Sequence, residues 1–229
     1  MMRLFLLVSV GLLLMWSPPL STAGYRGCGD RPEVEVDSDD TSTTANVCTA
    51  AGKALTLLAE YGLEPRRPIR IRIIDTAIDN HGYIAYGAYD SRTDTIELMS
   101  YDSILEHNAA ALMYGEFFDQ IHYHGAIAHE IAHAVFHHHS LNLSPGTAPQ
   151  EYLAHAVQLG VLPPERRRAI IARTGVSPWE SGDAVSDIYM ALEPTRFAVK
   201  SYTHLIAMAE PRAFIDILLN SKWFYVSIP

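Results

Sequence analysis

Five histidines and one glutamate lie within the eleven residues from His129 to His139. Among them, His129, Glu130 and His133 form the pattern His-Glu-X-X-His. Residues four apart lie one turn apart on the same face of an α-helix, so both imidazoles can bind one metal ion. Glu130 lies about 100° further around the helix. There its carboxylate can take the proton of an attacking water molecule. The spacing therefore predicts a zinc site of the catalytic kind.

A solvated, histidine-rich helix is the alternative explanation of the same residues. Nine of the eleven histidines lie between His107 and His155, and this local enrichment makes a chance match more common. The surrounding apolar residues follow helical spacing and favour the metal site, because they predict a helix over 116–138 with one buried face. They are Phe117, Ile121, Ala128, Ile131, Ala132 and Val135.

A catalytic zinc ion usually has three protein ligands and one open position, so a third ligand is needed. The sequence offers Glu151 and His139. His139 lies six residues after His133, which resembles the spacing of metzincin-type zincins. That resemblance implies an abrupt helix end in a turn that normally uses glycine, and Phe136 at that position is poorly suited to a positive φ. Glu151 lies in the first turn of a predicted helix over 149–159 and can reach the ion if the two helices pack together. The residues favour Glu151, with His139 as the alternative.

The elements that must position these side chains change in type along the chain. Helical periodicity predicts a helix over 43–61, ending at Gly62. Alternating residues then predict a strand over 69–75, and a hairpin of strands over 83–89 and 95–99 joined by the turn 90–94. After Ser100 only helices are predicted, over 101–106, 116–138, 149–159, 164–174 and between 183 and 219. Strands followed by helices indicate an α+β fold.

The N-terminus indicates export. A positively charged Arg3 precedes an apolar run from Leu4 to Trp16, which is shorter than the roughly 20 residues of a membrane span. Small residues at Ser21 and Ala23 predict cleavage after Ala23. We therefore expect a signal peptide over 1–23, a periplasmic or extracellular protein, and no membrane span in the mature chain.

The two cysteines and the net charge bear on the compartment of the protein and on its possible partners. Cys28 and Cys48 are the only cysteines, and an even number in an exported protein favours a disulfide, here joining the mature N-terminus to the first helix. The net charge of −9 disfavours nucleic acid as a partner. A peptide or protein substrate is compatible with both observations.

His129, Glu130 and His133, followed by Glu151 in a Glu-Tyr-Leu-Ala helix, resemble the gluzincin branch of the zincin metallopeptidases. The match covers roughly residues 117–160. The resemblance implies a small mixed sheet beside the active-site helix, one zinc ion, and hydrolysis of peptide bonds between an N-terminal α/β lobe over 24–140 and a helical lobe over 141–229. It also implies a Tyr or His of the helical lobe as donor to the substrate oxyanion, for which Tyr202 and His204 are the candidates.

One position departs from that family. Thermolysin-like members carry an aspartate four residues after the ligand glutamate, where it orients a zinc histidine. This sequence has His155 there. Either another carboxylate orients the histidine or the site is tuned differently.

Two other functions compete with an exported zinc peptidase. A metal-binding protein of the cell envelope could use the same histidines without catalysis, and it would have no need of Glu130. A helical interaction module would bind no stoichiometric zinc. The strand over 83–89, if it lies at a sheet edge, could align an extended substrate by strand addition.

Overall fold

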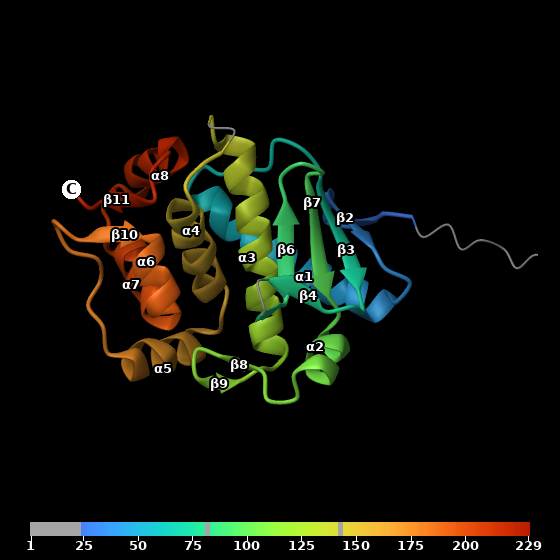
Figure 1. The fold of residues 1–229 in the computed structure, drawn as a ribbon. Coiled ribbons are helices and arrows are strands. Elements are labelled where there is room, and N and C mark those ends of the chain that lie inside the picture. Colours follow the sequence, from blue (N-terminus) through green and yellow to red (C-terminus); the bar gives the residue numbers. More distant parts are fainter. Residues whose placement is uncertain (1–23, 81–82, 142–143) are drawn as a thin grey trace, which may run out of the picture.

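The structure, a computed structural model, describes residues 24–80, 83–141 and 144–229 (Figure 1). The expected signal peptide over 1–23 lies outside the described residues. A five-stranded sheet stands beside two long helices, and shorter helices follow on the far side of these (Figure 1). Within the described ranges, no helix is both long and apolar enough to span a bilayer.

The main sheet is mixed, with the strand order β1-β2-β3-β7-β6. Strands β2, β3 and β7 are parallel to one another, whereas β1 and β6 run antiparallel to their neighbours. The strands are β1 (Arg26–Cys28), β2 (Arg31–Asp37), β3 (Ile69–Ile74), β7 (Thr95–Met99) and β6 (Gly87–Asp90). Strand β6 therefore lies at an edge and has a partner on one side only within the sheet.

The two faces of the sheet differ because the strands alternate apolar and charged residues. Charged side chains pair across the outer face, where Arg70 contacts Glu35 and Arg72 contacts Glu97. The opposite side chains are buried and belong to the core that includes helices α1 (Thr41–Glu60) and α3 (Gln120–His139). They are Val34, Val36, Ile69, Ile71, Ile96 and Leu98. Strands with helices packed on one face agree with the α+β class.

The remaining helices cover the other side of α3. Helix α4 (Thr147–Gly160) packs along α3, and α7 (Pro194–Ala207) packs along α4. The other helices are α2 (Tyr101–His107), α5 (Pro164–Thr174), α6 (Asp187–Leu192) and α8 (Pro211–Asn220). The larger buried apolar cluster includes residues from Cys28 to Ile228, and a smaller cluster lies around Leu159, Ile170 and Tyr202.

Several strands differ from the sequence prediction. Strands β1 and β2 were not predicted, and the strand expected over 83–89 divides at Tyr86 into β5 (Tyr83–Ala85) and β6. Strand β5 pairs with β4 (Ile78–Asn80), whereas β6 joins the main sheet. Four two- or three-residue strands also follow Ser100, namely β8 (Leu112–Met113), β9 (Glu116–Phe117), β10 (Ala184–Ser186) and β11 (Tyr225–Ser227). Segments this short carry too little periodicity to be recognised.

The helix predicted over 116–138 begins later, at Gln120. Asp119 is its N-cap, and its carboxylate accepts a hydrogen bond from the backbone N–H of His122. The preceding residues form the β8–β9 hairpin, whose turn residues Tyr114 and Gly115 both have positive φ. Phe117, expected on the buried helix face, is therefore on the hairpin and 76% exposed.

The predicted disulfide is confirmed, since Cys28 of β1 is bonded to Cys48 of α1. It fastens the edge strand β1 to the helix that covers the sheet. The pairing is compatible with an oxidising compartment.

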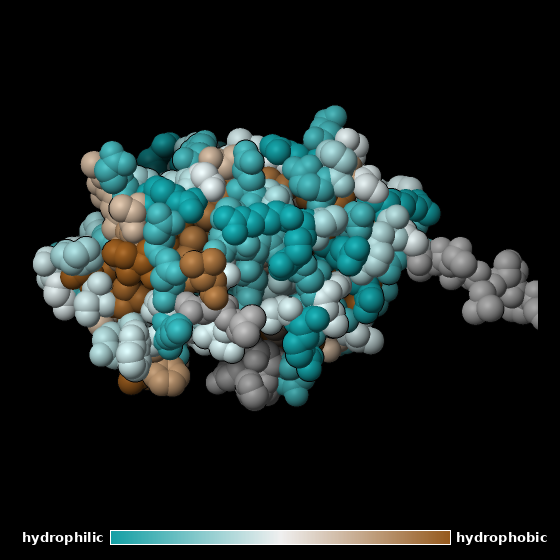
Figure 2. Space-filling model, turned by 90° about the horizontal axis from the view of Figure 1, so that it is seen from above, coloured by the Kyte–Doolittle hydropathy of each residue, from teal (hydrophilic) through white to brown (hydrophobic). Residues whose placement is uncertain are grey.

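Exposed apolar residues gather in the C-terminal part of the chain. Seen from above, hydrophobic surface lies mainly on the left, the side on which α6, α8 and β11 lie in Figure 1 (Figure 2). The large exposed side chains of these elements and of the segment before β11 are Ile188, Leu192, Ile217, Trp223, Phe224 and Tyr225. The sheet side of the molecule is more polar.

Candidate metal centre

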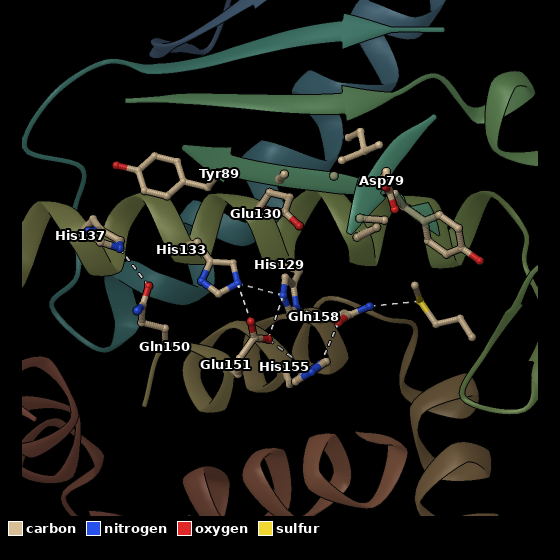
Figure 3. A pocket seen from close by; sticks show the side chains of 17 residues that line it. Asp79, Tyr89, His129, Glu130, His133, His137, Gln150, Glu151, His155 and Gln158 are labelled. Atoms are coloured by element: carbon tan, nitrogen blue, oxygen red, sulfur yellow. Dashed lines mark hydrogen bonds and ion pairs between the residues drawn. The ribbon is translucent and has the colours of Figure 1, made fainter. Parts of the chain in front are cut away.

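His129 and His133 lie on one face of helix α3, as their spacing of four residues predicted. The side chains of His129 and His133 are 14% and 13% exposed and line a pocket (Figure 3). Ile131 and Ala132, between them in sequence, are buried in the core on the other side of the helix. The apolar face thus fixes the rotation of the helix, and this rotation directs both imidazoles into the pocket.

Glu151, in the first part of α4, points toward the two imidazoles (Figure 3). The Nε2 atoms of His129 and His133 are 3.0 Å apart. They lie 3.3 and 3.5 Å from the two carboxylate oxygens of Glu151. Zinc binds such nitrogen and oxygen atoms at about 2.0–2.2 Å, so two ligands of a tetrahedral ion are about 3.4 Å apart. Each of the three residues offers one ligand atom, these atoms lie within 4.8 Å of one another, and the residues could therefore hold one metal ion.

His139 does not join this group. Its Nε2–H donates to the backbone oxygen of Glu64 at 2.7 Å. Helix α3 continues through Phe136 to His139, without the abrupt turn that a return to the motif requires. Of the two candidate third ligands, the structure brings Glu151 to the histidines.

The three donors stabilise one another electrostatically. Burial alone would raise the pKa of Glu151, but the charges and hydrogen bonds of His133 and His129 outweigh it and hold the pKa well below its usual value. Burial likewise opposes a charge on His129, yet the hydrogen bond and charge of Glu151 leave its pKa raised. Glu151 is therefore an ionised donor, and a proton competes with metal for His129.

Glu130 lies beneath the edge strand β6. It is 8% exposed and lines the same pocket. A Cβ atom on Gly87 would lie 2.7 Å from Cγ of Glu130, a separation too short for two carbon atoms. The absence of a side chain at Gly87 therefore lets the backbone of β6 approach the carboxylate.

The pocket has a volume of about 560 Å³ and lies between α3, α4 and the edge of the sheet. Its walls include strand β6, Asp79 of β4, and His137, which is one turn beyond His133 on α3. His137 contacts the side-chain oxygen of Gln150 at 2.9 Å and packs against the ring of Tyr89. The pocket is large enough for a few residues of an extended chain, and its edge strand runs along one side (Figure 3).

One residue beside the donors, Gln158, was not recognised in the sequence as a partner of the histidines. Gln158 contacts Nδ1 of His129 at 3.0 Å and Nδ1 of His155 at 3.1 Å. Burial and the charge of His129 lower the pKa of His155 to about 4. The contact with Nδ1 of His129 is made by an amide, Gln158, and not by a carboxylate. Its spacing of seven residues from Glu151, two turns of α4, was the available signal.

Tyr202 and His204 do not reach the pocket, and the expectation that either donates to a substrate oxyanion is not supported. Both are 8% exposed and belong to the face of α7 that packs against α4. The ring of Tyr202 packs in an apolar cluster that includes Leu159 of α4. Nδ1 of His204 lies 2.6 Å from the hydroxyl of Tyr152. Each therefore contributes to packing between helices.

Comparison with known proteins gives a family without an assigned activity. Neither the curated proteins nor the solved structures include a significant match. Residues 34–227, which include both helices of the site, match the family of unknown function DUF6639. Since this match covers most of the chain, the protein belongs to the family DUF6639.

Proposed function

We propose that the protein is a zinc-dependent hydrolase, and specifically a peptidase, with His129, His133 and Glu151 as metal ligands and Glu130 as general base. The observation that carries this proposal is the convergence of the three donors, which lie within 4.8 Å of one another in a pocket that also contains Glu130. Bound zinc would supply Lewis acidity and lower the pKa of a water molecule in the pocket.

The residues of the chain have separate roles in this proposal. Glu130 takes the proton of the attacking water and delivers it to the leaving amine. The free edge of β6 hydrogen-bonds the backbone of an extended substrate, because its backbone groups on that side have no strand partner in the main sheet. A peptide is therefore a better match for the pocket than a compact small molecule.

We also propose that the protein is exported. The Cys28–Cys48 disulfide supports an oxidising compartment, together with the apolar N-terminal sequence.

The test compares wild type with Glu130→Gln on a peptide library read by mass spectrometry, with zinc content measured on the same samples. We expect wild type to cleave peptides, and Glu130→Gln to retain zinc and lose at least about 100-fold of the activity, the usual contribution of a general base. Glu97→Gln is the matched control, because Glu97 lies on the outer face of the sheet and pairs with Arg72. A Glu130→Gln protein with wild-type turnover would contradict the proposal. A zinc protein with no cleavage by wild type would favour the non-catalytic metal-binding function.

A further inference from the structure

The pocket beside the proposed metal centre has two chemically different ends (Figure 3). His137 lies at one end, past His133, where its Nε2 contacts the side-chain oxygen of Gln150 at 2.9 Å. Asp79 of β4 lies at the other end, on the side of His129, and is exposed in the pocket wall. A substrate group that extends from the centre toward the Asp79 end therefore meets a carboxylate.

Apolar side chains line the same end of the pocket. Ala126 lies on α3 about one turn before the motif, and Ile78 precedes Asp79 on β4. Met113 lies beside Gln158, whose amide nitrogen donates to the Met113 sulfur at 3.1 Å. A long side chain with an apolar stem and a charged head suits this lining, because the stem can contact apolar atoms while the head reaches the carboxylate.

The charged side chains of the pocket have one sign. Among the described residues of its lining, the charged ones are Asp79, Glu130 and Glu151, and neither lysine nor arginine is present. With neutral histidines, these three carboxylates have a formal charge of −3, which one bound Zn²⁺ reduces to −1. A cleft lined by charge of one sign concentrates ligands of the opposite sign. The lining thus favours a cationic group in the substrate.

We propose that the Asp79 end of the pocket binds a lysine or arginine side chain of the substrate, so that the enzyme cleaves peptides close to a basic residue. This inference rests on the proposed function, because it names the substrate class of the same site. Asp79 is then a specificity-determining residue, since its carboxylate accepts hydrogen bonds from the ammonium or guanidinium group. The substrate backbone lies along β6, where the small residues Gly87 and Ala88 line the pocket.

Cleavage of a randomised peptide library, read by mass spectrometry, tests this preference with wild type and Asp79→Asn in parallel. At one position beside the cleaved bond, we expect wild type to enrich lysine and arginine over glutamine and methionine, which have side chains of similar length. Two peptides that differ only by Lys or Met at that position then give a ratio of kcat/KM values. Asp79→Asn should lower this ratio about 3- to 10-fold, as expected for one charged hydrogen bond that is open to solvent.

Two further variants complete the test. Asp79→Lys should move the preference to glutamate and aspartate, because the charge at that end is reversed. Asp90→Asn is the matched control and should keep the wild-type ratio, because the Asp90 carboxylate contacts Arg92 at 2.9 Å outside the pocket. If wild type cleaves peptides without enriching basic residues, or if Asp79→Asn keeps the full preference for lysine, this inference fails while the proposed function stands. If wild type cleaves no peptide, both fail.

Discussion

Gly87 of the edge strand and Glu130 of the motif helix are in contact, and the contact leaves no space for a side chain on the strand. A methyl group at Gly87 would meet Cγ of Glu130 at 2.7 Å and one of its carboxylate oxygens at 3.3 Å. Glu130 can keep its position only while residue 87 is glycine. The strand thus helps to set the place of the proposed general base.

Gly87→Ala should therefore lower activity while the metal site stays intact. We expect kcat/KM to fall about 10- to 100-fold, since a displacement of about 1 Å at a catalytic group can have an effect of this size. Zinc content should be unchanged. The control is Gly52→Ala in α1, where an added Cβ meets nothing within 4 Å. Wild-type kinetics in folded Gly87→Ala would show that Glu130 has no catalytic role in its present position.

Gln158 is expected to control metal affinity through the orientation of His129. Gln158→Leu removes the oxygen that contacts both Nδ1 atoms, and a loss of this kind typically weakens metal binding 10- to 100-fold. Gln158→Glu keeps an acceptor and should retain most of the affinity. The matched control is Gln150→Leu on the same helix, which should bind zinc as wild type does. Equal affinities of Gln158→Leu and wild type in a chelator competition would refute the role.

The metal-free protein should lose stability as the pH falls from about 7 to 5. Burial lowers the pKa of seven described histidines, namely His122, His124, His137, His138, His139, His155 and His204. The unfolded chain takes up protons near the usual pKa of 6.5, before the folded chain does. The seven histidines therefore contribute to the free energy of unfolding above pH 6.5, and this contribution is lost as the pH falls below 6.5. The raised pKa of His129 acts in the opposite direction, but it is one group against seven.

Urea denaturation at several pH values measures this effect. Each histidine that stays neutral in the folded protein adds up to about 1.4 kcal/mol per pH unit to the slope of the free energy of unfolding against pH. His122, whose side chain is 0% exposed, is the best single test, and His122→Gln should reduce the slope. A free energy of unfolding that stays constant or rises between pH 7 and pH 5 would be incompatible with this account.

The Cys28–Cys48 disulfide should stabilise the fold mainly through the unfolded chain. The bond joins residues separated by 20 positions, and a loop of this length corresponds to about 3 kcal/mol of lost chain entropy. The double variant Cys28→Ala/Cys48→Ala should therefore unfold at lower urea concentration than the oxidised wild type. Under reducing conditions the two proteins should have similar stabilities. An unfolding free energy unchanged by the double substitution would contradict this expectation.

Local spacing in the sequence was enough to predict the part of the site that lies on single helices. His129 and His133 are one turn apart, and the preference for Glu151 over His139 followed from Phe136, which does not favour the required turn. Helices α1, α3, α4 and α5 were likewise found by their periodicity, and each observed bound lies within four residues of the predicted one.

The rest depended on tertiary packing, which one sequence does not reveal. Tyr202 and His204 were plausible donors until the face of α7 that packs against α4 was known. The contact of Gln158 with two histidines depends on how α3 and α4 pack, and the approach of Gly87 to Glu130 depends on the register of an edge strand. Strand β2 was missed although Val34 and Val36 alternate with charged residues, whereas β1 has three residues and is held by pairing with β2 and by the disulfide.

Metal content per chain tests the central claim most directly. Wild type, Glu151→Ala and His139→Ala are purified, incubated with Zn²⁺, freed of excess metal and measured by elemental analysis beside protein concentration. We expect one zinc per chain in wild type and in His139→Ala, and almost none in Glu151→Ala, because Glu151 supplies the third donor. Full zinc in Glu151→Ala, or its loss in His139→Ala, would contradict the account.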